Sequence, residues 1–518
     1  MTRMLRASAW LQELRARAAS GTAAATTGGE ATGTAMVVLA LALWMLPSPY
    51  ATAGVEVTVR PARFGAVFDP AEPARFTATV RNTGAAAEAE LRWRVERWSG
   101  GVLYEVEPVG LSVPPGESRA AELVGPAPGP LPQGECLRLV VGLWAGGEKQ
   151  QEWRKGFGFL PARTPTGPPE DSPFGLLGEH GWPLMQRLGV RYVRPNWSWA
   201  ERPLEWAQRY GIATCPLINE ANAAATGRMS LDEYARFVGE SVRRYQGYIR
   251  YWQLGNEFDV FHHDGPPRYV EAQRVGYEAA KAADPDCVVV AGSITELQCR
   301  REGFREALDL GLAHYCDLYD FHFYQSPATT DELLTYIHET LAATDAVKPI
   351  WVTETTQVGM FDPDDDNQAA YVCRRYAHLL SRGISVVMWH ALTWPYPLSQ
   401  DPVAATALVD HDGFARPGLF AYAALTRELE GTRFAQSWPV GEGRQALEFA
   451  GPEKHVLIVW TEGEPGEITV RAPATECVTT DPTGHREVVP TREGALRLPL
   501  TSPPLLVTLG AAPVAVEG

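Results

Sequence analysis

The sequence predicts a multidomain protein: a central (β/α)8 TIM barrel flanked by an N-terminal immunoglobulin-like β-sandwich and a small C-terminal β-sandwich. Short apolar runs alternate with helical stretches between residues 174 and 430, which is typical of a parallel sheet built from βα units. On both sides of this block, strand-like runs and turn residues alternate without helical periodicity. A proline-rich linker, residues 161–173, precedes the central block.

The first 53 residues have the pattern of an export signal. Arginines precede an apolar run of eleven residues, Met36–Leu46, and Ala51–Ala53 (ATA) offers a small-residue cleavage site. The run is shorter than the roughly 17–25 residues that span a bilayer. We therefore expect a cleaved signal peptide and a protein that is secreted or held in the cell envelope. The alternative is an uncleaved segment that tethers the protein to a membrane.

Residues 54–160 predict the immunoglobulin-like β-sandwich. Apolar and polar residues alternate in Val55–Val59 (VEVTV), as in a strand with one buried face. Further strand-like runs are Phe76–Val80, Leu91–Val95 and Leu137–Val141. Turn-forming clusters such as Asn82–Gly84 (NTG) and Pro114–Gly116 (PPG) separate the runs at the spacing of short sandwich strands.

Residues 174–430 predict the barrel, because eight short apolar runs occur there with helical stretches between them. The runs are Phe174–Leu177, Val190–Arg194, Ile212–Ile218, Tyr248–Leu254, Val288–Ala291, Leu318–Phe323, Ile350–Thr353 and Ile384–Trp389. In one helical stretch, Ser230 and Glu233 have the spacing of a capping box. The block is close to the ~250 residues typical of such a barrel.

Residues 431–518 return to short strands and predict the C-terminal β-sandwich. The strand-like runs are Ala446–Ala450, Val456–Trp460, Ile468–Ala472 and Leu505–Leu509. Between two of them, Asp481–Gly484 (DPTG) has the composition of a β-turn.

The composition narrows the choice of partners. The formal net charge is −16, which disfavours nucleic acid and anionic membrane surfaces as binding partners. The seven cysteines contain no C-x-x-C pair, so neither a zinc motif nor a thiol redox motif is indicated. We expect most of them to be buried free thiols.

The candidates for chemistry are the polar residues directly after the apolar runs, because the active site of a (β/α)8 barrel lies at the C-terminal ends of its strands. The fourth run continues as YWQLGNEFD, which puts Asn256 and Glu257 at the mouth of the barrel. The seventh continues as PIWVTETT, which puts Glu354 there. Strands four and seven lie on opposite walls, so we expect the two glutamates to face each other.

Two opposed carboxylates suit the cleavage of a glycosidic bond. One carboxyl group donates a proton to the leaving oxygen, and the other attacks or stabilises the anomeric carbon. A separation of about 5–5.5 Å corresponds to a covalent intermediate and net retention. Neighbouring carboxylates do not both ionise readily, so one of them keeps its proton. The alternative for either glutamate alone is a helix cap or an ion pair with arginine.

With these residues, the barrel resembles clan A of the glycoside hydrolases, whose members pair Asn-Glu on strand four with Glu on strand seven. The resemblance covers residues 174–430 and is closest to the branch that holds family 39 and the related families 5 and 51. It implies that Glu257 is the acid/base and Glu354 the nucleophile of a retaining enzyme. It also implies that Asn256 hydrogen-bonds the sugar 2-hydroxyl and that neither metal nor cofactor takes part.

The resemblance extends to four residues at the ends of other strands. Arg194 matches an arginine beside the nucleophile. His322 and Tyr324 match a histidine and a tyrosine, of which the tyrosine hydrogen-bonds the nucleophile. Trp389 matches a tryptophan that forms the floor of the sugar subsite. The alternatives are a surface salt bridge for the arginine and ordinary packing for the other three.

The chain also departs from the family pattern. Phe258 stands where many members have a proline after the Asn-Glu pair. A second pair, Asn219–Glu220, follows the third run, so we expect it to bind substrate at most. The alternative is that Glu220 is the acid, which would require the strand count to be wrong by one. His390 and Trp394, after the eighth run, are weaker substrate-binding candidates.

Two segments could be read as metal sites. His262, His263 and Asp264 follow strand four, and the stretch Met360–Asn367 contains four aspartates. No third ligand at metal spacing accompanies the histidines, so we expect a loop on the substrate side there. For the aspartates we expect a solvated acidic loop.

The sequence therefore predicts a secreted retaining glycosidase that hydrolyses O-glycosyl bonds in an oligosaccharide or polysaccharide. One alternative is a non-catalytic carbohydrate-binding protein on a degenerate barrel. Another is a transglycosidase or phosphorylase that uses the same two carboxylates.

Overall fold

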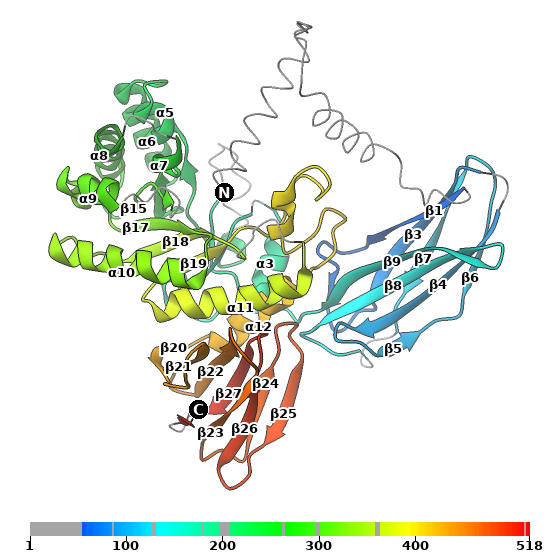
Figure 1. Cartoon of the computed structure of the whole chain (residues 1–518). Coiled ribbons are helices and arrows are strands. Elements are labelled where there is room, and N and C mark those ends of the chain that lie inside the picture. The colour runs from blue at the N-terminus through cyan, green and yellow to red at the C-terminus, as the bar shows by residue number, and fades with distance from the viewer. Residues whose placement is uncertain are drawn as a thin grey trace, which may run out of the picture. The chain divides into compact units, whose positions relative to one another are not determined.

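Eight parallel strands close into a barrel in this computed structural model (Figure 1). In order around the barrel they are β10 (Phe174–Leu176), β11 (Tyr192–Val193), β12 with β13 (Ala213–Thr214, Leu217–Ile218), β14 (Tyr251–Leu254), β15 with β16 (Val288–Val290, Ile294–Thr295), β17 (Tyr319–Phe323), β18 (Ile350–Thr355) and β19 (Val386–Trp389). The last strand, β19, pairs in parallel with β10 and closes the barrel. The predicted TIM barrel is confirmed, with a strand in each of the eight apolar runs.

The structure describes residues 54–84, 87–126, 131–178, 180–195, 208–261, 265–295, 301–357, 363–511 and 514–517. The predicted signal segment, residues 1–53, lies outside these ranges, and so do His262, His263 and Asp264.

Two barrel strands are interrupted where they run beside strand four. The third strand breaks at Pro216, which has no N–H to donate to the ladder, although its carbonyl accepts from the Gln253 N–H at 3.1 Å. The fifth strand breaks at Gly292, where a Cβ would lie only 2.7 Å from the Leu254 carbonyl oxygen. Both breaks let neighbouring backbone approach β14 closely.

Helices cover the outside of the barrel (Figure 1). They are α3 (Trp182–Leu188), α5 (Glu220–Ala225), α6 (Leu231–Arg244), α7 (Phe258–Phe261), α8 (Pro266–Ala283), α9 (Arg301–Asp309), α10 (Pro327–Ala343), α11 (Asp365–Ser381) and α12 (Pro417–Leu429). The predicted capping box is confirmed: Ser230 Oγ accepts from Glu233 N at 3.2 Å, and the Glu233 carboxylate accepts from Ser230 N at 3.1 Å. No helix in the described ranges is long and apolar enough to cross a membrane.

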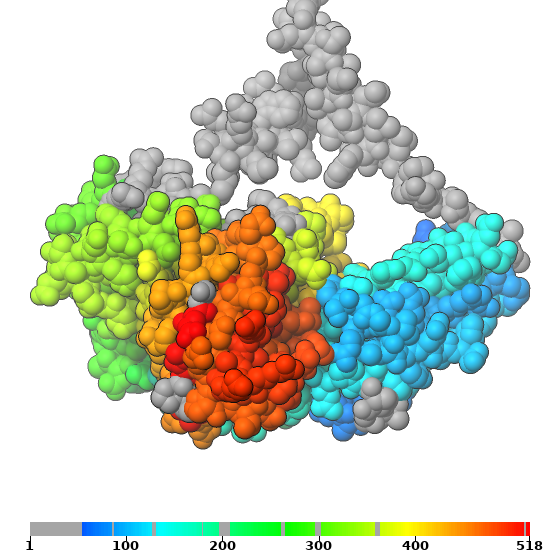
Figure 2. Space-filling view, turned by 60° about the horizontal axis from the view of Figure 1, so that its bottom comes forward, coloured from blue at the N-terminus to red at the C-terminus, as the bar shows by residue number. Residues whose placement is uncertain are grey.

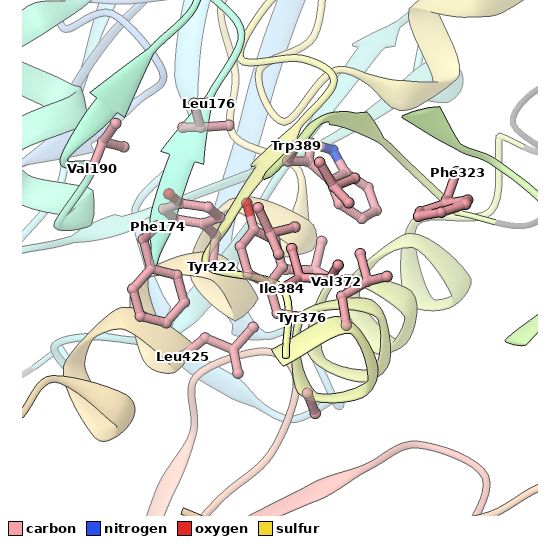
Figure 3. Packing of buried hydrophobic residues seen from close by; sticks show 14 of the residues in the cluster. Phe174, Leu176, Val190, Phe323, Val372, Tyr376, Ile384, Trp389, Tyr422 and Leu425 are labelled. Carbon is pink, nitrogen blue, oxygen red and sulfur yellow. The ribbon is translucent and has the colours of Figure 1, made fainter. Parts of the chain in front are cut away.

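Alternate residues of each barrel strand face two different apolar layers. The inner layer, inside the barrel, contains Tyr192, Tyr251, Trp351 and Met388. The outer layer packs strands against helices, and Figure 3 shows part of it around Phe174, Tyr376, Trp389 and Tyr422. The position of a residue in this alternation therefore decides whether its side chain reaches the barrel interior.

The N-terminal β-rich domain has two sheets that enclose their own apolar core. The smaller sheet has the order β1 (Val55–Pro61), β3 (Arg75–Asn82), β7 (Ser118–Val124). The larger has the order β2 (Val67–Phe68), β9 (Glu148–Phe159), β8 (Cys136–Ala145), β4 (Ala87–Arg97), β5 (Val102–Glu105), with β6 (Val109–Val113) also on β4. The immunoglobulin-like assignment of this domain stays a prediction.

The C-terminal β-rich domain also has two sheets, and Figure 2 shows one face of it in orange and red. The larger has the order β20 (Arg433–Ser437), β21 (Arg444–Ala450), β22 (Lys454–Thr461), β27 (Leu505–Gly510), β24 (Glu476–Thr480), β25 (Arg486–Pro490). The smaller has the order β26 (Ala495–Leu500), β23 (Gly466–Arg471), β28 (Ala515–Glu517). Leu447, Phe449 and Ile458 of the larger sheet join the outer apolar layer of the barrel.

The cysteines within the described ranges are buried free thiols, as expected for most of them. They are Cys136, Cys215, Cys287, Cys316, Cys373 and Cys477.

Candidate active site

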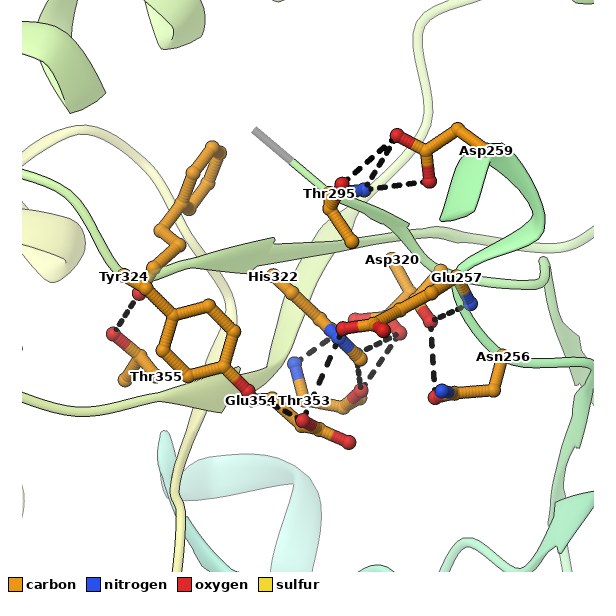
Figure 4. A network of polar contacts seen from close by, with 12 residues as sticks. Asn256, Glu257, Asp259, Thr295, Asp320, His322, Tyr324, Thr353, Glu354 and Thr355 are labelled. Atoms are coloured by element: carbon orange, nitrogen blue, oxygen red, sulfur yellow. Dashed lines mark hydrogen bonds and ion pairs between the residues drawn. The ribbon is translucent and has the colours of Figure 1, made fainter. Parts of the chain in front are cut away.

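Two glutamates and a histidine meet at the C-terminal end of the barrel (Figure 4). Glu257 follows β14 and precedes α7, Glu354 lies in β18 and His322 lies in β17. One carboxylate oxygen of each glutamate and a ring nitrogen of His322 all lie within 4.8 Å of one another. The structure thus brings Glu257 and Glu354 together across the mouth of the barrel.

An irregularity in β18 turns Glu354 toward this mouth. Trp351 is opposite Asp320 on β17, but Glu354 is opposite His322, so β18 has one residue more than its partner over this stretch. Regular alternation from Trp351 would turn Thr353 inward and Glu354 outward. With the extra residue, Thr353 bonds to Asp320 inside the barrel while Glu354 still faces the mouth.

Arg194, which follows β11, orients Glu354. Its Nη1 donates to Glu354 Oε1 at 2.6 Å. Its Nε donates to Gln253 Oε1 at 2.5 Å, and its Nη2 donates to Asn256 Oδ1 at 2.6 Å. The Arg194 side chain is 3% exposed, so three separate acceptors fix the guanidinium where little water competes.

These contacts keep Glu354 ionised. Burial raises the pKa of Glu354, but the charges of His322 and Arg194 outweigh burial and hold that pKa well below its usual range. The Tyr324 hydroxyl donates to Glu354 Oε2 and acts in the same direction. Burial, and then the charge of Glu354, raise the pKa of Tyr324 itself, so the phenol stays a donor. Glu354 is therefore a carboxylate able to form a bond to carbon.

Glu257 has a left-handed backbone with φ +44°, a conformation that costs about 1–3 kcal/mol in a non-glycine residue. Neighbouring groups stabilise this conformation. Glu257 N donates to Ser293 Oγ at 2.9 Å, and Phe258 N donates to the Ser293 carbonyl at 3.2 Å. The Asn222 side chain donates to the Asn256 carbonyl at 2.7 Å and accepts from Asn256 N at 2.9 Å. The segment that carries Glu257 is thus held from both sides.

The orientation of the Asn256 amide follows from its neighbours. Its Oδ1 accepts from Arg194 at 2.6 Å and from Ser293 Oγ at 3.4 Å. A guanidinium group has only donors, so the oxygen of the amide must face Arg194. The NH2 group then faces away from Arg194 and can donate to a hydroxyl group.

His322 is fully buried and hydrogen-bonded at both ring nitrogens. Its Nδ1 lies 2.8 Å from Glu257 Oε1 and 3.6 Å from Glu354 Oε2, and its Nε2 lies 3.1 Å from Thr353 Oγ1. Burial lowers the pKa of His322, but the nearby carboxylates of Glu354, Asp320 and Glu257 outweigh it and raise the pKa to about 10. Because 3.6 Å exceeds hydrogen-bond distance, the ring is bonded to Glu257 and not to Glu354.

Contrary to the sequence prediction, Trp389 does not line the mouth of the barrel. It faces the outer layer, is 0% exposed, and donates from Nε1 to the Thr406 carbonyl at 3.0 Å (Figure 3). The next residue, His390, turns back toward the mouth, where it lies near Glu354, and burial lowers the pKa of His390. The rings of His390 and Trp394 are 5.2 Å apart. Alternation along the strand thus places His390, and not Trp389, beside the glutamates.

The second Asn-Glu pair, Asn219–Glu220, follows β13 in strand three, as expected, and begins α5. Burial raises the pKa of its glutamate. In the acidic segment, Asp364 caps α11 by accepting from Asp366 N at 2.9 Å, and Asp365 pairs with Arg416. These aspartates therefore serve the start of a helix.

Sequence reasoning missed several polar residues of the site: Asn222, Gln253, Ser293, Asp320 and Thr353. A signal existed for two of them, because each is a polar residue inside an otherwise apolar strand, in YWQL and YDFHF. Burying such a group is unfavourable unless it finds partners, so its presence indicates a polar network within the barrel.

The cluster of Glu257, His322 and Glu354 is better suited to proton transfer than to binding a metal ion. Glu257, His322 and Glu354 offer the ligand types that a divalent cation takes. However, Arg194 and Tyr324 already donate to the two oxygens of Glu354. A cation there would also face the positive charge of the guanidinium group.

Solved structures resemble this chain closely enough to identify the fold. A family 39 glycoside hydrolase from Bacteroides cellulosilyticus WH2 matches with a TM-score of 0.65 at 17% sequence identity, over 87% of this chain and 100% of that one. The chain has the fold of a family 39 glycoside hydrolase. In this family 39 fold, Glu257 follows strand four and Glu354 lies near the C-terminal end of strand seven.

Other solved structures are more distant. A family 39 β-xylosidase from Caulobacter crescentus has a TM-score of 0.46 at 15% identity, over 68% of this chain and 98% of that one. A glucosidase from Croceicoccus marinus has a TM-score of 0.49 at 13% identity, over 67% of this chain and 98% of that one. No family model and no curated protein matches the sequence.

Proposed function

We propose that the protein is a retaining glycoside hydrolase in which Glu354 is the nucleophile and Glu257 the acid/base. The observation that carries the proposal is the unequal environment of the two carboxyl groups, which lie within 4.8 Å of His322 and of each other. Arg194 and Tyr324 donate to Glu354 and hold it ionised, whereas Glu257 Oε1 lies 2.8 Å from His322 Nδ1, a group with which it can exchange a proton. A pair of this kind matches double displacement better than inversion, which needs a wider gap for water.

In the first step, a Glu354 oxygen attacks the anomeric carbon, the glycosidic C–O bond breaks, and Glu257 gives its proton to the leaving oxygen. In the second step, Glu257 takes a proton from water, whose oxygen attacks the same carbon and displaces Glu354. The Asn256 NH2 group donates to the sugar 2-hydroxyl, a contact that strengthens as positive charge develops on the ring. The substrate is an oligosaccharide or a polysaccharide.

The test is the separate removal of each glutamate. We expect Glu354→Ala and Glu257→Ala each to lower kcat/KM on a glycoside with a poor leaving group by about 10²–10⁴-fold. Azide should restore activity with an activated aryl glycoside in Glu257→Ala and give a glycosyl azide of retained configuration, because that variant still forms the glycosyl-enzyme, whereas any azide product of Glu354→Ala would have inverted configuration. Glu220→Ala, which removes the other glutamate of an Asn-Glu pair, is the matched control and should keep most of the activity.

Two results would count against the proposal. Full activity of either variant on the glycoside with the poor leaving group would contradict the catalytic roles of Glu257 and Glu354. It would favour a carbohydrate-binding role for the barrel. If NMR showed that the product has inverted anomeric configuration, the retaining mechanism alone would be contradicted.

We also propose export with cleavage after the apolar run Met36–Leu46, which the sequence pattern supports. N-terminal sequencing of the mature protein tests this. A new N-terminus near Ala53 is expected, whereas an intact Met1 in a membrane fraction would indicate a tether.

A further inference from the structure

Behind the two glutamates, a buried aspartate organises the interior of the barrel (Figure 4). Asp320 precedes His322 by two residues on β17, so both face inward, and it is 1% exposed. It accepts hydrogen bonds from Thr353 N at 2.9 Å, Thr353 Oγ1 at 2.7 Å and Gln253 Nε2 at 2.7 Å. The backbone N–H and the amide nitrogen can only donate, so Asp320 is the acceptor in this network.

The direction of each hydrogen bond follows from this acceptor. The Thr353 hydroxyl has one proton and donates it to Asp320, so its lone pairs face His322 Nε2 at 3.1 Å. His322 must therefore carry a proton on Nε2 and donate a hydrogen bond to Thr353 Oγ1. Asp320 Oδ2 lies 3.5 Å from the same nitrogen. In the neutral imidazole, Nδ1 is then the bare nitrogen, and it faces Glu257 Oε1 at 2.8 Å.

We infer that His322 is the proton partner of Glu257, and that Asp320 and Thr353 are positioning residues that fix the tautomer which makes this possible. The resting enzyme holds one proton between Glu257 Oε1 and His322 Nδ1. The inference rests on the proposed function, since it assigns a store for the proton that Glu257 transfers.

The proton balance closes over the two steps. In the first step, the shared proton leaves with the departing alcohol, and Glu257 becomes a carboxylate beside neutral His322 protonated at Nε2. In the second step, water loses a proton to the pair as its oxygen bonds to the anomeric carbon. The proton on His322 Nε2 stays there throughout both steps, hydrogen-bonded to Thr353 Oγ1, so the ring does not need to rotate.

The charges around His322 favour a proton on the pair. Glu257 faces the ring from the end of β14, Glu354 from β18 and Asp320 from β17, against the positive charge of Arg194. His390 and Tyr324 also surround the His322 ring, and both are neutral. Burial lowers the pKa of His390. The ring of Tyr324 lies 6.4 Å from that of His322. The pKa of His322, raised to about 10, is consistent with a proton that the pair retains at neutral pH.

The experiment compares two threonines of β18 that differ in what they bond. Thr353→Val removes the hydroxyl between His322 and Asp320. Thr355→Val is the matched control, because Thr355 is equally buried but its Oγ1 donates to the Phe323 carbonyl at 2.6 Å. A third variant, Asp320→Asn, removes the buried charge.

The measurement is kcat/KM against pH for an aryl glycoside that the wild type hydrolyses. In Asp320→Asn we expect the basic limb to move to lower pH by about one unit or more, because a lost negative charge weakens proton binding to the pair. Thr353→Val should move it in the same direction by less, and Thr355→Val should leave it in place. A purely structural role would lower the rate at every pH without moving the limb.

A second readout does not depend on turnover. In 15N-histidine-labelled protein, one imidazole should keep its proton on Nε2 at high pH in the wild type and in Thr355→Val but lose this preference in Thr353→Val. An unmoved limb together with an unchanged tautomer in Thr353→Val would overturn the inference while leaving the glycosidase in place. If the wild type hydrolyses no glycoside but the NMR result holds, the proposed function fails and the tautomer assignment stands.

Discussion

Arg194 distributes its guanidinium group over three acceptors, Glu354, Gln253 and Asn256. Each contact has a different consequence. The first keeps Glu354 ionised and orients it, the second links to the buried network of Asp320, and the third turns the Asn256 amide so that its NH2 group can donate. One side chain thus couples the two strands that carry the chemistry.

Lysine at this position keeps the charge but offers only a point donor that does not span three acceptors. We expect Arg194→Lys to lower kcat/KM by about 10- to 100-fold, the equivalent of one charged hydrogen bond. In the wild type the pKa of Glu354 is lowered, so a weaker contact lets it rise toward its usual value. The acidic limb of kcat/KM against pH should therefore move to higher pH. An acidic limb that stays in place would show that Arg194 does not control the ionisation of Glu354.

At the scale of elements, the turn after β14 shows how backbone geometry aims two consecutive side chains at one site. Regular alternation would turn Asn256 and Glu257 to opposite faces. Gly255 with φ +91° and Glu257 with φ +44° break the alternation, and Asn222 of α5 holds the result. A Cβ on Gly255 would lie 2.8 Å from Asn222 Oδ1.

This geometry predicts that Gly255→Ala displaces Asn222 and with it the Asn-Glu pair. We expect a loss of kcat/KM of at least tenfold, together with a strain of about 1–2 kcal/mol from the left-handed φ. Gly227→Ala is the matched control, since Gly227 has φ +71° but nothing within 4 Å of the added Cβ. Thermal unfolding should show a loss of stability in both variants, larger in Gly255→Ala because of the contact with Asn222, whereas only Gly255→Ala should lose activity. Equal activities would contradict the role of Asn222.

At the scale of the whole molecule, a segment of the barrel domain packs into the core of the N-terminal β-rich domain. Phe414, in the segment between β19 and α12, is fully buried in the core of that domain. Its ring lies 4.7 Å from that of Trp153 and 6.0 Å from that of Phe76. Lys155 of β9 also pairs with Asp410 of the same segment. The segment that begins at His390 is thus anchored in another domain.

Because of this anchor, we expect Phe414→Ala to destabilise the protein by about 3–5 kcal/mol, the usual effect of deleting a buried phenylalanine. It should also raise KM, since the same segment carries His390 and Trp394. Calorimetry and steady-state kinetics measure the two effects. Leu398→Ala, a change at an exposed position of the same segment, should alter stability by less than about 0.5 kcal/mol. An unchanged KM in Phe414→Ala would show that anchoring this segment does not affect substrate binding.

The sequence by itself determined the βα order, the strand count and the polar residues that end the strands. These are local patterns, and parallel strands bring their C-terminal ends together in any closed barrel. The positions of Glu257 and Glu354 could therefore be predicted from two short motifs, and Asn219–Glu220 could be set aside by counting strands.

Only the tertiary structure decided which way each side chain faces. The extra residue in β18 turns Glu354 inward, and the alternation of β19 buries Trp389 and presents His390. The network of Gln253, Asp320 and Thr353 joins strands far apart in the sequence. Such contacts depend on the register between strands, which closure of the barrel sets and the residue pattern of a single strand does not.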